Sequence, residues 1–458
     1  MTPTPLIRTR PSLNAVAAPI FGEFLLGMTV AMAGLYLASH TSDAAAGTFG
    51  LTQQVLETLF VVFRVLAIGL GVVVSQLLGS NRAEAARQTA YMALSASTWA
   101  GLLVIGLLVF GRGAILQALN APAAVVPLAM GYMLLLAPAM LLEAYNLSMA
   151  AVLRAHLFAR ESLWIMVAMH GSHLLLAVLL MRGLGPWEGW GLGGYALAYL
   201  LSRAVGLWLH LRFWQRRMGL HPSRRHWWAL SPGAIAPALR IGLPGAAQEL
   251  AYRLAFMVSV AATARLGVAA LATHSYTLQT LKYVLLISMA IGWGCEIMVG
   301  RMLGAGRLKE ADAMVRKGVR NGMLASGSLA LAAALGAPWI MRSFTQDATI
   351  ISVAQQLLWL SVLLELGRVF NLVVIGSLRA TGDVLFPVVA SMASFVLVLG
   401  LGSYVLSRPW GLYGVWLAYV VDECLRGALM WWRWRHRGWL PYARRHLKTL
   451  RHKDVPKP

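Results

Sequence analysis

The chain has few charged residues, few acidic residues and almost no cysteine. Only 12% of its 458 residues are charged, and 17 residues are acidic. About a quarter of the residues of a soluble protein carry charge, so the composition argues against a soluble fold. The two cysteines, Cys295 and Cys424, both lie in apolar stretches. Such a pair implies neither a disulfide framework nor a thiolate metal site.

Several catalytic motifs are missing as well. GxxxxGK followed by Ser or Thr does not occur, so no phosphate-binding loop is expected. The sequence also has no HExxH, no GxSxG within an apolar run and no cluster of metal-ligand residues. We therefore expect no enzyme, no cofactor and no metal site, and an intramembrane enzyme or sensor is the least favoured class.

Long apolar runs dominate what is present. Hydrophobic residues make up 59% of the chain. A helix of about 20 apolar residues is long enough to cross the ~30 Å core of a bilayer. The sequence predicts twelve such spans, approximately at 15–37, 51–79, 89–110, 126–152, 162–181, 190–211, 234–263, 275–300, 318–340, 352–378, 386–406 and 411–432.

The basic residues are concentrated in alternate loops between these spans. With the N-terminus placed inside, 29 of the 39 Lys and Arg residues lie on the inner side and five on the outer side. This asymmetry follows the positive-inside rule and predicts that both termini are cytoplasmic. The net charge of +22 is then explained by topology and by contact with anionic lipid headgroups, and we expect no nucleic-acid partner.

The chain contains an internal repeat. VVVSQLLGSNRAEA (72–85) corresponds to IMVGRMLGAGRLKE (297–310) at an offset of 225. GWGLGGYALAY (189–199) corresponds to PWGLYGVWLAY (409–419) at an offset of 220. Six spans in each copy give the two copies the same orientation, an arrangement that is common in secondary transporters.

The predicted fold is therefore an all-α polytopic membrane protein with twelve transmembrane helices in two pseudo-symmetric six-helix bundles. Its predicted parts are an N-terminal six-helix lobe (1–213), a basic cytoplasmic linker (214–233), a C-terminal six-helix lobe (234–432) and a basic cytoplasmic tail (433–458).

The repeated motifs resemble those of the multidrug and toxic compound extrusion (MATE) family over about residues 15–440. The matching stretches are IGLPGAAQEL (241–250), ARLGVAALATHSYTLQ (264–279), GRMLGAGRLKEAD (300–312), SLRATGDVLFP (377–387) and GLYGVWLAYVVDECLRG (411–427). The resemblance implies two six-helix lobes that rock to open a central cavity alternately to the two sides of the membrane. It also implies export of organic compounds, usually cationic or amphipathic, driven by the entry of protons or sodium ions.

Besides Arg240, Arg320 and Arg426, which are counted with the inner side, thirteen charged residues fall inside the predicted spans. They are Glu23, Glu57, Glu143, Glu249, Glu296, Glu365, Asp422, Glu423, Arg64, Arg203, Arg253, Lys282 and Arg368. A charge at the bilayer centre costs about 2.5–3.5 kcal/mol. Most of these side chains must therefore face one another or a wet cavity.

The repeat places opposite charges at several equivalent positions. The offset of 225 relates Glu57 to Lys282 and Glu143 to Arg368, and the offset of 220 relates Arg203 to Glu423. If these mates lie near the pseudo-two-fold axis, they pair across the lobe interface. The predicted residues for lining the cavity and pairing the lobes are Glu57, Lys282, Arg253, Arg368, Asp422 and Glu423.

Two further pairs lie on single helices. Glu249 and Arg253 are four residues apart, in the order that favours an ion pair, and Glu365 and Arg368 are three apart in LLELGRVFN (363–371). We predict that LLELGRVFN lines the cavity side of the C-terminal lobe and that Arg368 restrains Glu365 until substrate or a proton displaces it. The alternative is a buried pair that only keeps the helix packed.

Glu23 has no basic residue within one helical turn. An unpaired carboxyl in a low dielectric is readily protonated, which suits a proton carrier. The alternative is a protonated glutamate bonded to a neighbouring helix. We predict Glu23, then Glu249 and Glu365, and then Glu143 as the ion-coupling residues.

Three positions depart from the ion sites of the family that the chain resembles. The first-span aspartate of many prokaryotic members falls near Gly34 or Leu35, and the seventh-span glutamate of sodium-coupled members falls near Tyr252. Arg368 stands where much of the family has a tenth-span aspartate. The coupling chemistry of the family therefore does not transfer residue by residue.

The leading interpretation is a monomeric proton-coupled antiporter in the cell inner membrane that exports small amphipathic organic cations, with sodium as the less favoured ion. The alternative is a flippase for a lipid-linked anionic headgroup, which is favoured by the intramembrane bases Arg64, Arg253, Lys282 and Arg368. With Arg240 counted on the inner side, spans one, two, seven and eight hold four carboxylates against three bases. This count barely separates the two functions.

Overall fold

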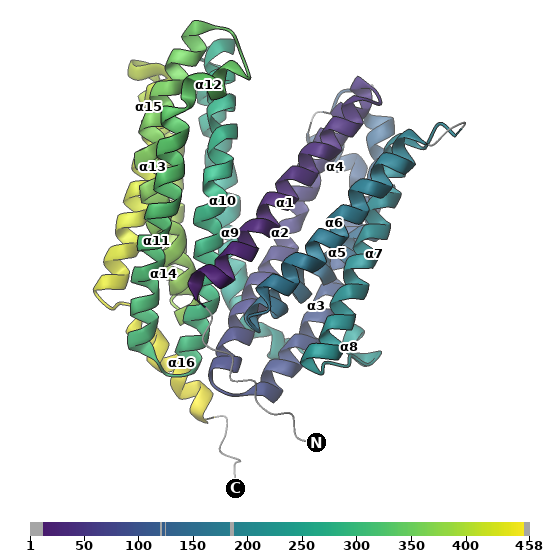
Figure 1. Ribbon diagram of the computed structural model, residues 1–458, viewed down its shortest axis with the longest axis vertical. Helices are drawn as coiled ribbons and strands as arrows, with labels where there is room; N and C mark the ends of the chain where they lie inside the picture. The colour runs from purple at the N-terminus through teal and green to yellow at the C-terminus, as the bar shows by residue number, and fades with distance from the viewer. Residues whose placement is uncertain (1–11, 120, 124, 184–186, 453–458) are drawn as a thin grey trace. The chain divides into compact units, whose positions relative to one another are not determined.

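Residues 12–119, 121–123, 125–183 and 187–452 are described by the computed structural model. Most residues in these ranges are helical, and none of them forms a β-strand (Figure 1). The first eleven residues of the predicted N-terminal lobe and the last six residues of the predicted basic tail lie outside the described residues.

The helices follow the predicted spans closely. The first half of the chain forms α1 (Leu13–Ser39), α2 (Asp43–Gly79), α3 (Ala83–Phe110), α4 (Arg112–Ala118), α5 (Val126–Ala155), α6 (Ala159–Arg182), α7 (Gly191–Met218) and α8 (Arg225–Trp228). The second half forms α9 (Pro232–Ala264), α10 (Val268–Gly304), α11 (Leu308–Leu335), α12 (Ala337–Arg342), α13 (Ala348–Thr381), α14 (Leu385–Ser394), the π-helical η1 (Phe395–Leu401), α15 (Gly402–Arg435) and α16 (Leu440–His452).

Nine helices of the described residues are long and apolar enough to cross a membrane. One of these runs from Leu385 to Arg435 and contains two spans, because Gly411 breaks it with a non-helical conformation (φ 55°, ψ −135°). α9 and α11 carry more charged residues but are as long as their neighbours. The predicted twelve spans and the all-α fold class are confirmed.

The predicted ninth span, 318–340, is wrong in one respect, because it is not one continuous helix. α11 ends at Leu335, and the amide of Gly336 donates to the carbonyl of Ala332 at 2.8 Å. Pro338 lies in the first turn of α12, where its missing N–H leaves no helical hydrogen bond unmade. The same proline cannot continue α11, so the chain starts a new short helix.

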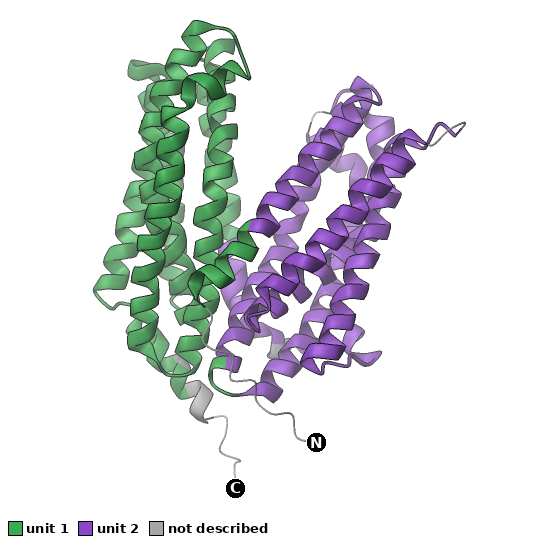
Figure 2. Ribbon diagram, viewed as in Figure 1, with its two compact units in different colours: residues 1–21, 79–81, 247–458 green, residues 22–78, 82–246 purple. Residues whose placement is uncertain are grey.

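The chain forms two compact units (Figure 2). Among the described residues, unit 1 comprises 12–21, 79–81 and 247–452, and unit 2 comprises 22–78 and 82–246. In unit 1, α10, α11 and α15 all pack on α13, and in unit 2, α3, α6 and α7 all pack on α5. The exact lobe boundaries predicted from the sequence stay a prediction.

The apolar core of each unit lies between these helices. In unit 2 it includes Met140 and Met149 of α5, and in unit 1 it includes Leu357 of α13 and Trp416 of α15, each of which is fully buried. Large apolar side chains also point outward, and Leu175 is 73% exposed. Such outward faces are expected of helices that contact lipid.

The repeat is visible in the backbone as well as in the sequence. Gly191 and Gly411, which are related by the offset of 220, both have positive φ values of 52° and 55°. A Cβ added at Gly194 or at Gly414 would lie 2.1 Å or 2.0 Å from a carbonyl oxygen of the preceding span. The motif GLxG therefore recurs because each copy needs the same turn and the same close helix approach.

Candidate functional site: buried ion pairs

α13 carries the stretch LLELGRVFN, and its two ends are fixed by the local sequence. Asp347 caps the start, because its carboxylate accepts from the amides of Thr349 at 2.8 Å and Ile350 at 3.2 Å. Gly382 ends the helix in the left-handed conformation with φ 86°. The helix between them places Glu365 and Arg368 in the middle of unit 1.

The side chain of Glu365 is fully buried. One carboxylate oxygen accepts from Arg368, one turn further along α13. The other accepts from the hydroxyls of Ser326 at 3.1 Å and Ser288 at 3.4 Å, and these two hydroxyls are themselves bonded at 2.9 Å. The predicted pairing with Arg368 is confirmed. The prediction that LLELGRVFN lines the cavity side of the C-terminal lobe stays a prediction. The carboxylate of Glu365 itself accepts from side chains of α10, α11 and α13.

Arg368 also reaches across to α15. Its Nε donates to Glu423 Oε1 at 3.2 Å. Asn371 of α13 donates to the second oxygen of Glu423 at 2.9 Å, and Arg426 lies 3.1 Å from that same oxygen. Glu423 thus accepts from two guanidinium groups, which can only donate, and from the side-chain amide nitrogen of Asn371.

Asp422 completes the cluster on α15. Arg426 donates to its Oδ2 through Nε and Nη2, at 3.0 Å and 2.5 Å, and the hydroxyl of Ser394 donates to its Oδ1 at 2.7 Å. The guanidinium of Arg426 also lies over the ring of Phe395, 4.6 Å from its centroid. Ser394 ends α14 and Phe395 begins η1, so the cluster adjoins a π-helical turn, a feature that is frequent at functional sites.

We call Glu365, Arg368, Asp422, Glu423 and Arg426 the carboxylate network. It contains three carboxylates and two guanidinium groups, so its net charge is −1 when every group is ionised. Each of the six carboxylate oxygens accepts at least one hydrogen bond or ion pair within the described residues. The structure thus brings together three of the predicted candidates, Arg368, Asp422 and Glu423, with Glu365.

Unit 2 has an ion pair at the equivalent place. Arg203 of α7 donates from Nε to Glu143 of α5 at 2.5 Å, and its guanidinium lies 3.9 Å from the ring centroid of Tyr199. Glu143 is the repeat mate of Arg368, and Arg203 is the repeat mate of Glu423. Each of these four residues finds a partner inside its own unit. In both copies an ion pair joins the fourth span to the sixth. The carboxylate is on the fourth span in unit 2 and on the sixth span in unit 1, which explains the opposite charges at mate positions.

Glu23 is paired, so the prediction that it has no basic partner is wrong. Arg154 donates to its Oε2 at 2.7 Å, and both side chains are buried. The repeat mate of Arg154, Arg379, forms a two-fold hydrogen bond with Glu296 at 3.1 Å and 2.9 Å. The partner of Glu23 lies 131 positions further along the chain in the last turn of α5, beyond the predicted end of the span at residue 152.

The remaining predicted residues are more exposed. Glu249 and Arg253 form the predicted ion pair at 3.1 Å, and both side chains are about one-third exposed. Glu57 lies 3.5 Å from Arg64 on the same helix. The amino group of Lys282 donates to Gln279 at 3.2 Å. The predicted pairing of Glu57 with Lys282 and the coupling roles of all these residues stay predictions.

The place of the missing first-span aspartate is occupied by an aromatic side chain. A Cβ added at Gly34 would lie 2.6 Å from the hydroxyl oxygen of Tyr195 and 2.8 Å from the ring of Phe49. Tyr252 packs its ring on Phe395 at 5.3 Å. Within the described ranges, no three His, Cys, Asp or Glu side chains come close enough to hold a metal ion.

Two repeats of six helices, each with a charge pair buried between its fourth and sixth spans, define a duplicated membrane protein of the transporter class. The MatE family model matches residues 19–179 and 244–404. The two matches start 225 residues apart (244 − 19), which is the offset of the internal repeat. The chain belongs to the MatE family of transporters, and the resemblance found in its motifs is confirmed.

The relatives extend over nearly the whole chain. The uncharacterized transporter YisQ of Bacillus subtilis is 29% identical and covers 94% of this chain and 95% of its own length. The probable multidrug resistance protein NorM of Thermotoga maritima is 22% identical and covers 92% of this chain and 91% of its own length.

Two solved structures agree in fold. A MATE protein in the bent conformation has a TM-score of 0.85 at 16% identity, with 94% of this chain and 96% of that chain covered. A MOP superfamily transporter from Pyrococcus furiosus, described as having a binding pocket of reversed polarity, has a TM-score of 0.82 at 16% identity. The match covers 93% of this chain and 95% of that chain.

Proposed function

We propose that this chain is a secondary active exporter that exchanges protons for amphipathic organic cations by alternating access. The observation that carries the proposal is the charge of the carboxylate network, in which three buried carboxylates face two arginines. A buried charge without a compensating partner is costly. Uptake of one proton removes the excess charge, and release of that proton restores it.

Glu365 is the group best suited to take the proton. Its Oε2 is bonded to the hydroxyls of Ser288 and Ser326. A hydroxyl can turn from donor to acceptor, so a protonated Glu365 can donate into the same pair. Glu423 has no hydroxyl partner, because it accepts from the guanidinium groups of Arg368 and Arg426 and from the amide nitrogen of Asn371. Asp422 has one hydroxyl partner, Ser394, but its other oxygen accepts two N–H groups of Arg426, so Glu365 with two hydroxyls is placed first. The network thus favours an ionised Glu423 beside a titrating Glu365.

The same hydrogen bonds favour a proton over a sodium ion. A metal cation is bound by several oxygen atoms that point their lone pairs at it. In the carboxylate network these lone pairs accept from N–H and O–H groups. Protonation needs one lone pair and the rotation of one hydroxyl.

The arginines count against an anionic cargo. Arg64, Arg253 and Arg368 each lie within ion-pair distance of a carboxylate of the same unit. A lipid-linked anion would have to displace those carboxylates before it met a free guanidinium. We therefore place export of organic cations before the flippase.

The coupling needs no direct contact between ion and cargo. It requires that proton and cation favour different states of the transporter, so that each lowers the affinity for the other. We place the protein in the cell inner membrane as a monomer with both termini in the cytoplasm. The excess of Lys and Arg in alternate loops supports this orientation.

Transport into proteoliposomes tests the proposal. Ethidium would be the fluorescent cation, first with an imposed proton gradient and then with a sodium gradient. We expect movement with the proton gradient, its loss in Glu365→Gln, and no loss in Glu84→Gln, which removes an exposed carboxylate at the start of α3. Movement with sodium alone would contradict proton coupling. Absence of movement under both gradients, from folded protein, would transfer the proposal to the lipid-linked anion.

A further inference from the structure

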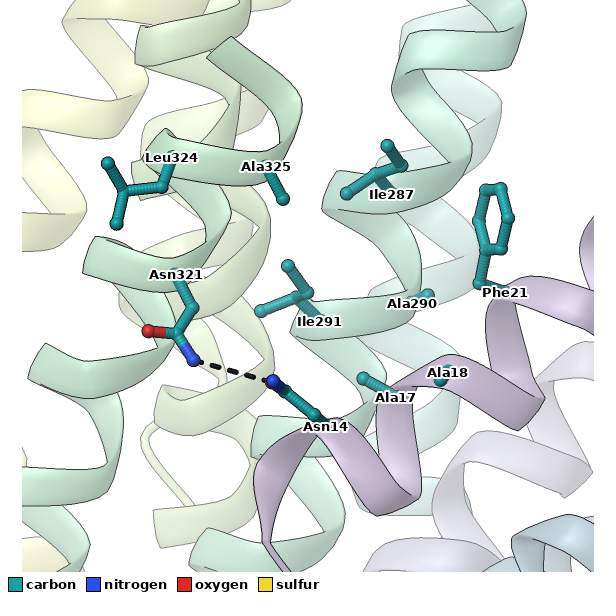
Figure 3. Close-up of a pocket in the computed structure, with 10 residues that line it drawn as sticks. All are labelled: Asn14, Ala17, Ala18, Phe21, Ile287, Ala290, Ile291, Asn321, Leu324 and Ala325. Atoms are coloured by element: carbon teal, nitrogen blue, oxygen red, sulfur yellow. Dashed lines mark hydrogen bonds between the residues drawn. The ribbon is translucent and has the colours of Figure 1, made fainter. Parts of the chain in front are cut away.

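Unit 1 has an open apolar groove along its surface (Figure 3). Its volume is about 610 Å³, and its walls come from the first turns of α1, from α10 and from α11. Small side chains, including Ala17 and Ala325, make it hollow, and Phe21 lies at the end away from the asparagines. Leu324 on its rim is 67% exposed.

One end of the groove is polar. The side-chain amide of Asn321 donates to Asn14 Oδ1 at 3.4 Å, and both residues line the groove. The other lining side chains are hydrocarbon. The hollow is thus an amphipathic slot, with two amides at one end and an apolar channel leading away from them.

A positive charge lies next to the polar end. Lys317 is exposed and precedes Asn321 by four residues on α11, so the two side chains lie on the same helix face, about 5–6 Å apart at their Cβ atoms. Arg320 is also exposed. The acidic residues of α11 are already used, because Glu310 pairs with Arg307 at 3.2 Å and Asp312 pairs with Arg316 at 3.0 Å. No acidic residue of α11 therefore neutralises Lys317 at the polar end of the groove.

We propose that this groove binds one anionic phospholipid. The lipid phosphate contacts the amides of Asn14 and Asn321 and the ammonium group of Lys317, and one acyl chain lies along the alanines toward Phe21. Charge complementarity selects this occupant. A zwitterionic lipid adds its own cation beside Lys317, and an organic cation meets a like charge there. The site belongs to unit 1 alone, so the proposal stands whether or not the proposed cargo is correct.

Lipid retention in native mass spectrometry tests the proposal. Purified full-length protein would be supplied with equal amounts of phosphatidylglycerol and phosphatidylcholine, and the lipids that stay bound would be counted. We expect one retained phosphatidylglycerol. Lys317→Gln should weaken its retention about fivefold, as a basic residue near an anionic headgroup contributes on that scale. Ala325→Phe, which fills the channel, should abolish it.

The matched control is Leu331→Phe, an exposed leucine further along α11 and outside the groove. It introduces the same aromatic ring and should leave lipid retention unchanged. Equal retention of both lipids, an unchanged signal in Lys317→Gln, or equal losses in Ala325→Phe and Leu331→Phe would each overturn the proposal. Displacement of the bound lipid by ethidium would overturn it too, since the occupant would then be the cargo.

Discussion

Arg203 of α7 and Glu143 of α5 form an ion pair at 2.5 Å in unit 2. Unit 1 has an ion pair between the equivalent helices, but the carboxylate and the guanidinium have exchanged places. There the carboxylate, Glu423, is on the last span and the guanidinium, Arg368, is on the tenth, at 3.2 Å. All four side chains are no more than 13% exposed. The two copies of the repeat have therefore kept an interhelical charge pair at this position without keeping its direction.

Because both arrangements of the ion pair occur in this chain, unit 2 should accept the arrangement of unit 1, with the guanidinium on α5 and the carboxylate on α7. The double variant Glu143→Arg with Arg203→Glu should fold, whereas either single change should destabilise the protein by about 3–5 kcal/mol or more, because it buries two like charges. Thermal unfolding of the purified variants measures the difference. A double variant as unstable as the single ones would contradict the exchange.

The excess carboxylate of the network predicts proton release on cargo binding. In weakly buffered detergent solution, addition of ethidium should release close to one proton per molecule of protein, because the cation favours the ionised network. A pH indicator measures this. Glu365→Gln should bind the cation without releasing a proton. Proton release that persists in this variant would show that a residue other than Glu365 releases the proton.

Gly34 predicts a packing defect that depends on Tyr195. Gly34→Ala should destabilise the protein by about 1–3 kcal/mol, as expected of overpacking, because the new Cβ meets the tyrosine hydroxyl at 2.6 Å. Tyr195→Phe in the same chain should restore part of the loss. The control is Gly27→Ala on the same helix, where nothing lies within 4 Å of the new Cβ. Equal effects at both glycines would refute the explanation.

Asp383 predicts a pH-dependent contribution to stability. It lies in the loop between α13 and α14, where its Oδ2 accepts from Arg433 at 2.8 Å and its Oδ1 has no hydrogen-bond partner within the described residues. Burial raises the pKa of this carboxyl above its usual 3.8, although the hydrogen bond from Arg433 acts in the opposite direction.

A raised pKa means that the folded state holds this proton more tightly than the unfolded state. The contribution of Asp383 to stability is therefore complete below its usual pKa of 3.8 and is lost as the pH rises through the folded value. The Tm of the wild type minus that of Asp383→Asn should fall as the pH rises from about 4. A constant difference across the acid range would contradict this.

The sequence was sufficient for the fold because the apolar runs and the repeat are strong and regular signals. The offset of 225 residues predicted two copies of six spans, and the family model matches the chain with the same spacing. The break at Gly336 was missed because a glycine and a proline between two apolar helices change the hydropathy very little.

The charge pairs were predictable only where both members lie on one helix. Glu249 with Arg253 and Glu365 with Arg368 follow from helical spacing. The partner of Glu23 does not, since Arg154 approaches from another helix and the sequence places it in a loop. Glu143 pairs with Arg203 and Arg368 with Glu423 inside each unit, and not with their mates. The pairing of mates across the lobe interface stays a prediction, because the sequence alone does not indicate which helices lie side by side.

The exchanged pair also constrains the history of the duplication. Two identical copies began with the same residue at each mate position, so each of these positions has since changed in at least one copy. A route by single charge reversals would have passed through a chain with two like charges buried together, at a cost of about 3–5 kcal/mol or more. The accessible route runs through uncharged residues at this site. Ancestral members of this lineage are therefore expected to have had a half in which neither position was charged.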